Sequence, residues 1–417
     1  MIEQARQRTV TLLAAAGLPP QPAGTSADAA LRRLVIAADH HITAAPGVVA
    51  GFPWFGEWSR DTMTSYAGLF LSSGRIREGA ALLRRYAGTV SRGMLANTAD
   101  TGAAEYNTAD GTLWFVHAIG RHVEVTGDRQ LGVDLAPVLA EILAAHRAGT
   151  RFGIGVDPAD GLLRAGSGTT AGTPDDAEHV ALTWMDARVD GVPVTPRHGK
   201  PVEVNALWIN ALAVLGRLLP EPDEAVELRE QAVKSFRARF LLPGGGLRDV
   251  VDAPGPDGPV DDDTLRPNQL LAASLPDGPL AGDPVAALGV VRAVAALVTP
   301  LGLRTLPPGA AQYRPVHRGG PANRDAAYHQ GTVWPWLIGP YADALAAAGL
   351  PTDTVLDGLL DGLLGHLTEA GLGSVSETAD GDAPHATTGC PFQAWSVAEL
   401  LRLLKPPRPS LPAGGPR

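Results

Sequence analysis

The sequence predicts a predominantly α-helical protein built as a ring of helical hairpins. Apolar residues return at three- and four-residue steps in about a dozen segments, which is the pattern of helices with one buried face. Extended runs of alternating polarity are scarce. Long connections rich in Gly, Pro and Asp lie at 165–178, 188–200, 242–263 and 302–324. Loops of this length inside a domain are commonly functional or disordered, and in a ring of hairpins they would converge on one mouth.

Each expected helix follows from its own apolar periodicity. A cap at Ser26 or Asp28 precedes the first helix of the ring, and a separate short helix is expected before Gly17. The ring helices are predicted at residues 29–42, 62–71, 77–90, 113–126, 131–148, 202–219, 224–240, 268–273, 284–298, 326–348, 354–367 and 393–404.

One large domain is expected to account for most of the chain. Residues 1–25 are predicted to form an N-terminal helix and a linker, and residues 26–405 the domain itself. Residues 406–417 are predicted to be a disordered tail, because prolines and glycines cannot hold a packed helix there. We find no repeat of fixed period and no internal boundary between independent domains.

The composition narrows the class of partner. A formal net charge of −10 argues against nucleic acid or an anionic membrane as the main partner, since both require a basic surface. Cys390 is the only cysteine, so no internal disulfide can form and a reducing cytoplasm is the expected location. The first residues lack the apolar core of a signal peptide, and no apolar run reaches the roughly 18 residues of a membrane span. Neutral ligands remain, and sugars are the obvious class.

Tryptophan and acidic residues occur together on several short segments at the edges of the expected helices. The first of these segments holds Trp54, Trp58, Arg60 and Asp61. Aromatic faces stack on the apolar faces of sugar rings, and an Arg–Asp pair brackets hydroxyl groups with charge-assisted hydrogen bonds. The structural alternative is a salt bridge, with Asp61 capping a helix.

Two further segments carry candidate acids. Asn107 and Asp110 precede the helix predicted from residue 113, where Asp110 either contributes to a site or simply caps the helix. Trp184 and Met185 would give Asp186 an apolar wall. Desolvation of this kind raises the pKa of a carboxyl group and keeps a proton available for a leaving oxygen. An aspartate that caps a turn is the structural alternative for Asp186.

The candidates later in the chain are polar groups beside tryptophans or glycines. Lys200 and Glu203 follow the Asp186 segment, and His329, Gln330 and Trp334 share another short segment. A lone histidine at such a place is equally a satisfied polar group at the end of a buried helix. No Cys or His stands at metal-ligand spacing, so a metal site is not expected.

Glu377 lies in an irregular loop where a water-activating base could face an open cleft, although a surface glutamate is the structural alternative. Cys390 is a weak candidate for a nucleophile, because nothing in the sequence marks a paired base and buried thiols are usually inert. The sequence also lacks a Gly-rich phosphate loop, a G-x-S-x-G elbow and a dinucleotide fingerprint. General acid–base hydrolysis is the chemistry that these carboxylates perform without a cofactor.

These motifs, taken in order, resemble the amylo-α-1,6-glucosidase part of glycogen debranching enzymes. The resemblance implies an all-α (α/α)6 toroid, related in architecture to glucoamylases, with the site at the mouth of the ring and residues 26–405 as the catalytic domain. It also implies hydrolysis with inversion, in which the acid and base carboxylates lie roughly 6.5–9.5 Å apart. The matching stretches are 51–62, 106–115, 182–187 with 195–207, 265–269, 302–306, 324–341 and 376–399.

The resemblance also distributes roles among the candidates. Asp110 is the first candidate for the general acid, but the Trp-Met-Asp motif matches the family position better. The resemblance therefore implies Asp186 as the general acid, Glu377 as the general base and Asp110 in substrate binding. Arg60 and Asp61 resemble the pair that holds the terminal glucose. The expected substrate-binding set is Trp54, Trp58, Arg60, Asp61, Asn107, Asp110, Trp184, Lys200, Glu203, His329, Gln330 and Trp334.

One departure from the family bears on the substrate. Many debranching enzymes of this type carry a further N-terminal domain, but here the first motif arrives by residue 51. The expected activity is exo-acting release of glucose from α-1,6 branch stubs of glycogen or limit dextrin, with a partner chain as a possible source of a glucan-binding domain. The alternatives are hydrolysis of a small α-glucoside of the glucosylglycerate or trehalose type, and a sugar-binding toroid without catalysis.

Overall fold

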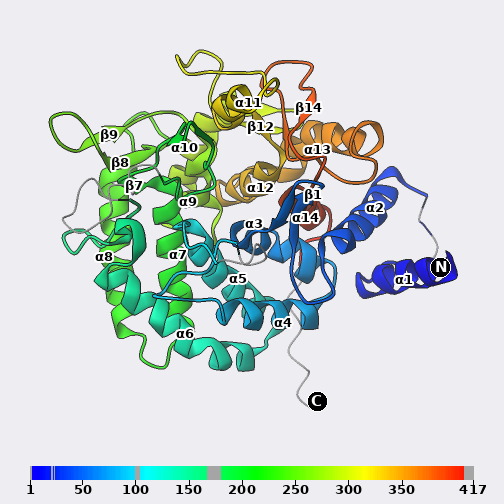
Figure 1. The fold of residues 1–417 in the computed structure, drawn as a ribbon, viewed down its shortest axis with the longest axis horizontal. Helices are drawn as coiled ribbons and strands as arrows, with labels where there is room; N and C mark the ends of the chain where they lie inside the picture. Colours follow the sequence, from blue (N-terminus) through cyan, green and yellow to red (C-terminus); the bar gives the residue numbers. More distant parts are fainter. Residues whose placement is uncertain (1, 20–21, 23, 99–103, 167–179, 408–417) are drawn as a thin grey trace.

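The computed structural model describes residues 2–19, 22, 24–98, 104–166 and 180–407. Over these residues the chain is predominantly helical, as the apolar periodicity predicts (Figure 1). Most of the loop predicted at 165–178, and the predicted tail from residue 408 onward, lie outside the described residues. Among the described helices, none is both long and apolar enough to cross a membrane.

Six helices of the described chain contact one another in cyclic order around the centre of the molecule (Figure 1). The last of them, α14, contacts the first, α3, so the series closes. Helix α7 shows why they lie inside, because thirteen of its seventeen residues are buried and it has no polar face to offer to water. These inner helices are α3 (Ser59–Thr64), α5 (Asp110–Thr126), α7 (Val202–Leu218), α9 (Leu270–Ser274), α12 (Ile338–Ala347) and α14 (Ala394–Leu404).

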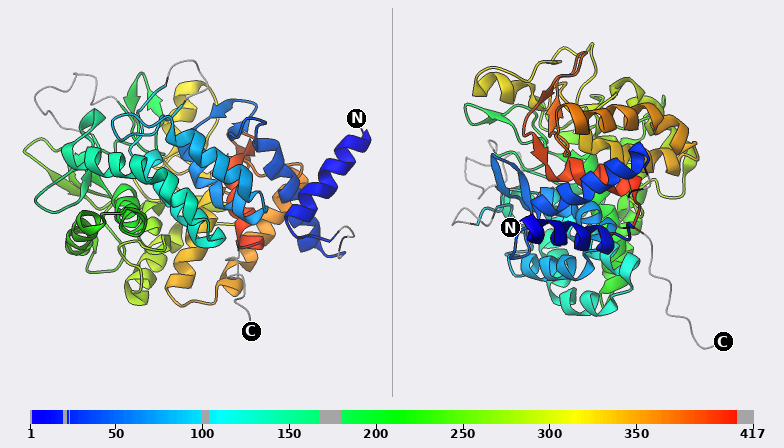
Figure 2. Two further views of the ribbon diagram at one scale, coloured as in Figure 1. Left: turned by 90° about the horizontal axis from the view of Figure 1, so that it is seen from below. Right: turned by 90° about the vertical axis from the view of Figure 1, so that its right-hand side faces the viewer.

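A second set of helices packs around the inner set and alternates with it along the chain. Helix α4 is amphipathic, with Leu82, Leu83 and Tyr86 buried while Arg84 and Arg85 reach solvent. Helix α8 packs along α7, α10 against α12, and α2 against α14. The outer helices are α2 (Ser26–His41), α4 (Ile76–Ala87), α6 (Arg129–Ala148), α8 (Asp223–Phe240), α10 (Pro284–Val294) and α13 (Thr352–Glu369). The N-terminal helix α1 (Ile2–Ala15) lies at the edge of the molecule against α2 (Figure 2).

The single helix expected at 326–348 is wrong, because the structure divides this stretch. Helix α11 (Pro321–Tyr328) ends before a short strand, β12 (Val333–Trp334), and a 3-10 turn (Pro335–Leu337) then leads into α12. Gly331 has φ +133, and a Cβ there would lie 2.6 Å from the ring of Tyr313. Pro335 lacks the N–H that a continuing helix would need. The helix expected at 62–71 is also divided, into α3 and a π-helical turn (Ala67–Ser72).

Short strands fold the connections into small antiparallel sheets. Strand β1 pairs with both β2 and β15, which ties the N-terminal part of the domain to its C-terminal part. A second sheet has the order β10-β11-β12-β13-β14, and a third has the order β7-β8-β9. The remaining bounds are β1 (Val49–Phe52), β2 (Phe55–Glu57), β3 (Gly155–Val156), β4 (Leu163–Arg164), β5 (Arg188–Val189), β6 (Val192–Pro193), β7 (Lys200–Pro201), β8 (Val250–Ala253), β9 (Val260–Asp262), β10 (Val298–Thr299), β11 (Gly302–Arg304), β13 (Thr378–Ala379), β14 (Thr387–Thr388) and β15 (Phe392–Gln393), with 3-10 turns at Arg151–Gly153, Pro267–Gln269 and Ala295–Leu297.

Candidate active site

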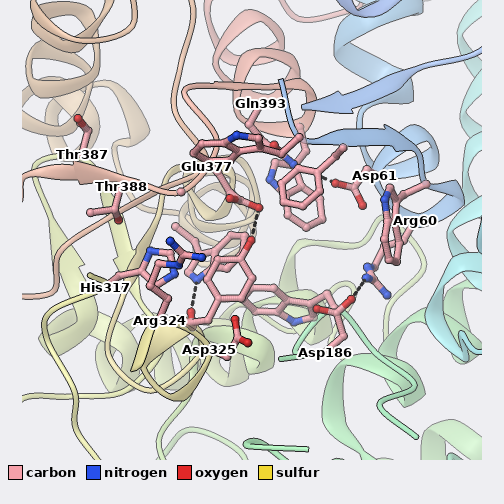
Figure 3. A pocket seen from close by; sticks show the side chains of 18 of the residues that line it. Arg60, Asp61, Asp186, His317, Arg324, Asp325, Glu377, Thr387, Thr388 and Gln393 are labelled. Carbon is pink, nitrogen blue, oxygen red and sulfur yellow. Dashed lines mark hydrogen bonds and ion pairs between the residues drawn. The ribbon is translucent and has the colours of Figure 1, made fainter. Parts of the chain in front are cut away.

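A pocket of about 830 Å³ opens where inner helices α3 and α14 begin (Figure 3). Its walls come from these two helix starts, from the β1–β2 hairpin, from α11, and from the loops that carry β12, β13 and β14. The lining residues are Trp54, Phe55, Trp58, Arg60, Asp61, Trp184, Asp186, His317, Arg318, Gly319, Arg324, Asp325, Tyr328, Trp334, Glu377, Thr387, Thr388, Gly389, Gln393 and Trp395. The pocket therefore gathers segments that are more than 300 residues apart in the sequence.

Arg60 and Asp61, in the first turn of α3, form one corner of the pocket (Figure 3). Arg60 is 3% exposed, and its Nη2 donates to Oδ2 of Asp186 at 2.6 Å. Asp61 accepts a hydrogen bond from Nε2 of Gln393 at 3.0 Å. Burial raises the pKa of Asp61 to about 7, although the charge of Arg60 opposes this shift. This corner therefore combines the fixed positive charge of Arg60 with a carboxyl group, Asp61, that titrates near neutral pH.

Asp186 faces the pocket from an irregular segment that follows Trp184. Its side chain keeps 30% of its surface exposed, and Oδ2 is held by Arg60. The surrounding protein raises the pKa of Asp186 by desolvation, while the ion pair with Arg60 opposes this effect. The ion pair with Arg60 engages Oδ2 and leaves Oδ1 outside it.

Glu377 lies just before β13, on a different side of the pocket from Asp186 (Figure 3). It is 3% exposed, and both of its oxygens accept hydrogen bonds. The hydroxyl of Tyr328 donates to Oε1, and the backbone N–H of Cys390 donates to Oε2 at 2.9 Å. Burial raises the pKa of Glu377 to about 8, and these two donors counteract the shift because they stabilise the ionised carboxylate.

An aromatic layer supports the floor of the pocket. The ring of Trp184 meets Trp334 and Trp336 edge to face, at centroid distances of 5.2 and 5.3 Å. Trp395 stacks on Trp336 at 5.4 Å. The indole N–H of Trp184 donates to Oδ1 of Asn268 at 3.0 Å, which fixes the orientation of its ring. These large rigid rings hold the walls around Asp186 in place.

Eight of the residues that the sequence assigns to the site line this pocket. They come from segments that the motifs singled out independently, and the structure brings them together. They are Trp54, Trp58, Arg60, Asp61, Trp184, Asp186, Trp334 and Glu377. The other six assigned residues, Asn107, Asp110, Lys200, Glu203, His329 and Gln330, do not line it.

Asp110 stands directly behind the pocket wall, at the start of α5. Its Oδ2 accepts the backbone N–H of Trp184 at 2.7 Å, and its Oδ1 accepts a hydrogen bond from Thr108 at 2.7 Å. Nη1 of Arg60 also lies 3.5 Å from Oδ1. Asp110 is 1% exposed, so it positions the groups that line the pocket and does not itself face the cavity.

Glu203 belongs to a buried cluster of two cations and two anions. Nε of Arg197 donates to Glu203 at 2.8 Å, and Nη1 of Arg197 pairs with Asp249. Nε of Arg266 lies 3.3 Å from Asp249. These four side chains are 1–7% exposed. Their charges balance one another, and the cluster links the start of α7 to the β8 segment.

Lys200 is likewise surrounded by its own counterions. Its Nζ lies 3.0 Å from Asp157, 2.5 Å from Asp160 and 2.7 Å from Asp252. The lysine is 1% exposed. Its hydrogen-bonding capacity is taken up within the protein, between β7, the segment before β4, and β8.

The last three assigned residues contact neighbouring protein groups. His329 is fully buried and stacks on Trp334 at 5.2 Å, and burial lowers its pKa well below the usual range, so the ring is neutral. Nε2 of Gln330 donates to the carbonyl of Val194 at 3.1 Å. Oδ1 of Asn107 accepts a hydrogen bond from Asn97 at 3.0 Å.

Several lining residues were not assigned from the sequence. Tyr328, Gln393 and Trp395 lie inside the sequence motifs described above, but other residues of those motifs were assigned to the site in their place. His317 and Arg318 lie on the loop at 302–324, where length and composition indicated function but no single side chain stood out. No group of His, Cys, Asp and Glu residues in the described chain is arranged to hold a metal ion.

Comparisons with known proteins identify the family of the chain. The family model for amylo-alpha-1,6-glucosidase matches residues 32–402. The glycogen debranching enzyme of Saccharomyces cerevisiae is 26% identical over 471 aligned positions, which cover 86% of this chain. The chain spans about 30% of the length of that curated relative.

Solved glycosidases share the fold at low sequence identity. The GH63 mannosylglycerate hydrolase from Thermus thermophilus, in complex with Tris and D-glycerate, has a TM-score of 0.66 and 14% identity, covering 90% of this chain and 99% of its own. A GH78 rhamnosidase of Bacillus sp. GL1 has a TM-score of 0.59 and 15% identity, covering 92% and 35%. A bacterial glucoamylase complexed with acarbose has a TM-score of 0.59 and 16% identity, covering 91% and 55%. These neighbours are (α/α)6-toroid glycosidases. Because the family model matches most of its length, the chain belongs to the amylo-alpha-1,6-glucosidase family of glycoside hydrolases.

Proposed function

We propose that this glycoside hydrolase cleaves α-glucosidic bonds with inversion of configuration, with Asp186 as general acid and Glu377 as general base. The observation that carries the proposal is the placement of these two carboxyl groups on different sides of one pocket, each in its own environment (Figure 3). In an inverting enzyme the base activates a water molecule on the face of the sugar opposite the leaving group, and the acid protonates the leaving oxygen. The two carboxyl groups are expected to be separated by roughly 6.5–9.5 Å to admit that water.

Each carboxyl group is held in a way that suits its role. Arg60 holds Oδ2 of Asp186, so the proton for the glycosidic oxygen would leave from the oxygen that faces the pocket. Glu377 must be ionised to remove a proton from water, and Tyr328 and the Cys390 N–H stabilise that form. Because burial outweighs these donors and raises the pKa of Glu377 to about 8, the ionised fraction of the base, and with it the rate, should increase as the pH rises towards 8. The proton taken by Glu377 and the one given by Asp186 balance, so one water molecule is consumed per bond.

The proposed scaffold is an (α/α)6 toroid. The cyclic contacts of the inner helices and the alternation of inner and outer helices along the described chain support it. In this arrangement the inner helices α3 and α14 begin at the pocket. The starts of these helices position Arg60, Asp61 and the hydrogen bond from Gln393 to Asp61.

For the substrate, we propose the α-1,6 branch stubs of glycogen or limit dextrin, with glucose as the product. The family match and the debranching relative support this choice. The second candidate is a small α-glucoside, which the likeness to mannosylglycerate hydrolase over 99% of that chain favours. A sugar-binding protein without catalysis is disfavoured, because both carboxyl groups are present in the pocket.

A substrate panel tests these alternatives. Purified protein is incubated with limit dextrin, isomaltose, trehalose and glucosylglycerate, and released glucose is measured with the anomer followed by NMR. The proposal predicts glucose from limit dextrin, released initially as the β-anomer. Activity confined to trehalose or glucosylglycerate would contradict the debranching substrate, and initial release of the α-anomer would contradict inversion.

A further inference from the structure

Trp54 is the one aromatic residue among the strongly exposed large apolar side chains of the described chain. Its side chain is 64% exposed, whereas Asp61, Trp184 and Glu377, which line the same pocket, are 3–6% exposed. Trp54 therefore lies at the rim of the pocket, outside the enclosed part where the reacting sugar would sit. An indole left largely in water at a catalytic pocket offers a flat apolar face to whatever enters or leaves.

The hairpin that carries Trp54 is connected to the corner of the pocket formed by Arg60 and Asp61. Strand β1 pairs with β2 through Gly51 and Phe55, and Gly51 also faces Gln393 of β15. The side-chain amide of Gln393 in turn donates to Asp61 at 3.0 Å. The position of Trp54 is thereby fixed relative to Asp61 through two backbone pairings and one hydrogen bond.

The same hairpin is also tied to the base. Sγ of Cys390 donates to the carbonyl oxygen of Phe52 at 2.7 Å, and the N–H of Cys390 donates to Glu377 at 2.9 Å. One residue thus connects the strand that leads to Trp54 with the carboxylate that would activate water. The indole is therefore a fixed platform beside the reacting centre.

We propose that Trp54 stacks on the first sugar ring of the leaving group, so that this site selects substrates whose aglycone is a pyranose. A pyranose presents a face of C–H groups that covers an indole, whereas an acyclic polyol has no such face. The leaving group is the part of the substrate that extends outward, because the reacting glucose occupies the buried part of the pocket. The inference rests on the proposed function and favours a saccharide over a small acyclic glucoside.

Two substrates with the same type of glycosidic bond distinguish stacking by Trp54 from a general effect of the hairpin on activity. Isomaltose and 1-O-α-glucosylglycerol both carry glucose on a primary alcohol, but only isomaltose has a ring in the leaving group. We expect Trp54→Ala to lower kcat/KM for isomaltose by roughly tenfold to hundredfold, the effect of losing one stacked aromatic contact. The value for glucosylglycerol should stay within about twofold of wild type. Trp54→Phe should retain most of the activity on isomaltose.

Val192→Ala is the matched control, since Val192 is 52% exposed and does not line the pocket. Equal losses on both substrates in Trp54→Ala, or no loss on either, would overturn the inference. A change from dimer to monomer on sedimentation of Trp54→Ala would also overturn it, because the indole would then belong to an interface between two copies. If the wild type hydrolyses neither substrate and no limit dextrin, the proposed function fails; if it hydrolyses them and Trp54→Ala is unchanged, only this inference fails.

Discussion

Substitution of Glu203 distinguishes a structural role from a ligand-binding role. The sequence motif assigns Glu203 to the site, whereas the structure places it among buried charged side chains. Glu203→Gln removes one of two anions from the cluster with Arg197, Arg266 and Asp249, and leaves two arginines facing a single carboxylate. All four side chains are at least nine-tenths buried. Removing one partner of a buried ion pair costs about 3–5 kcal/mol, since the remaining charge stays in the interior without compensation.

The assay is urea unfolding at pH 7 followed by circular dichroism, with kcat/KM on isomaltose measured at 25 °C. We expect the free energy of unfolding to fall by about 3–5 kcal/mol while kcat/KM of the folded variant stays within about twofold of wild type. Glu124→Gln is the matched control. It breaks the ion pair with Arg121, in which Glu124 is 57% exposed, and pairs of this kind contribute about 0–1 kcal/mol. A Glu203→Gln variant with unchanged stability and a large loss of activity would refute this reasoning and return Glu203 to the site.

Two further predictions concern the base. Tyr328→Phe removes the hydroxyl that donates to Glu377 and stabilises its ionised form. We therefore expect kcat to fall about tenfold or more, and the acid limb of the pH–rate profile to move to higher pH. Tyr313→Phe is the control, because the hydroxyl of Tyr313 binds Asp382 outside the pocket. In the Glu377→Gln background, Tyr328→Phe should have no added effect, and a multiplied loss would contradict a role through Glu377. Because the pKa of Glu377 is raised from 4.5 to about 8, the folded protein retains a proton that the unfolded chain releases, so the free energy of unfolding should fall as pH rises between these values, by on the order of 4 kcal/mol. Urea unfolding at pH 5 and pH 8 should show this fall in wild type and a smaller fall in Glu377→Gln; equal falls would contradict the raised pKa.

Local sequence patterns predicted most of the helices, because apolar residues recur at three- and four-residue steps within each segment. They did not predict the break between α11 and α12. The apolar residues on both sides of Gly331 and Pro335 keep helical spacing, but Pro335 lacks the N–H of a continuing helix, and Gly331 also approaches the ring of Tyr313. Such a contact between residues that are distant in the chain leaves no trace in a periodic pattern.

Site residues were predicted where a charged residue and a tryptophan stand together in one short segment. Arg60, Asp61 and Asp186 stand beside tryptophans, and the structure brings them to one pocket. Lys200 and Glu203 show the limit of this reasoning. Whether a charged residue beside a site motif faces the cavity or a counterion depends on residues far along the chain. For Lys200 those counterions include Asp157 and Asp160, which no local motif connects to it.

Hydrolysis of α-glucosyl fluoride tests the assignment of Asp186 as acid and Glu377 as base most directly, because fluoride leaves without being protonated. On isomaltose, Asp186→Asn and Glu377→Gln should each lose on the order of 10²–10⁴ in rate. On α-glucosyl fluoride, we expect Asp186→Asn to regain a rate close to that of wild type and Glu377→Gln to stay as slow as on isomaltose. The opposite pattern, with Glu377→Gln rescued and Asp186→Asn inactive, would show that the two roles are reversed, and rescue of neither variant would contradict Asp186 as the proton donor.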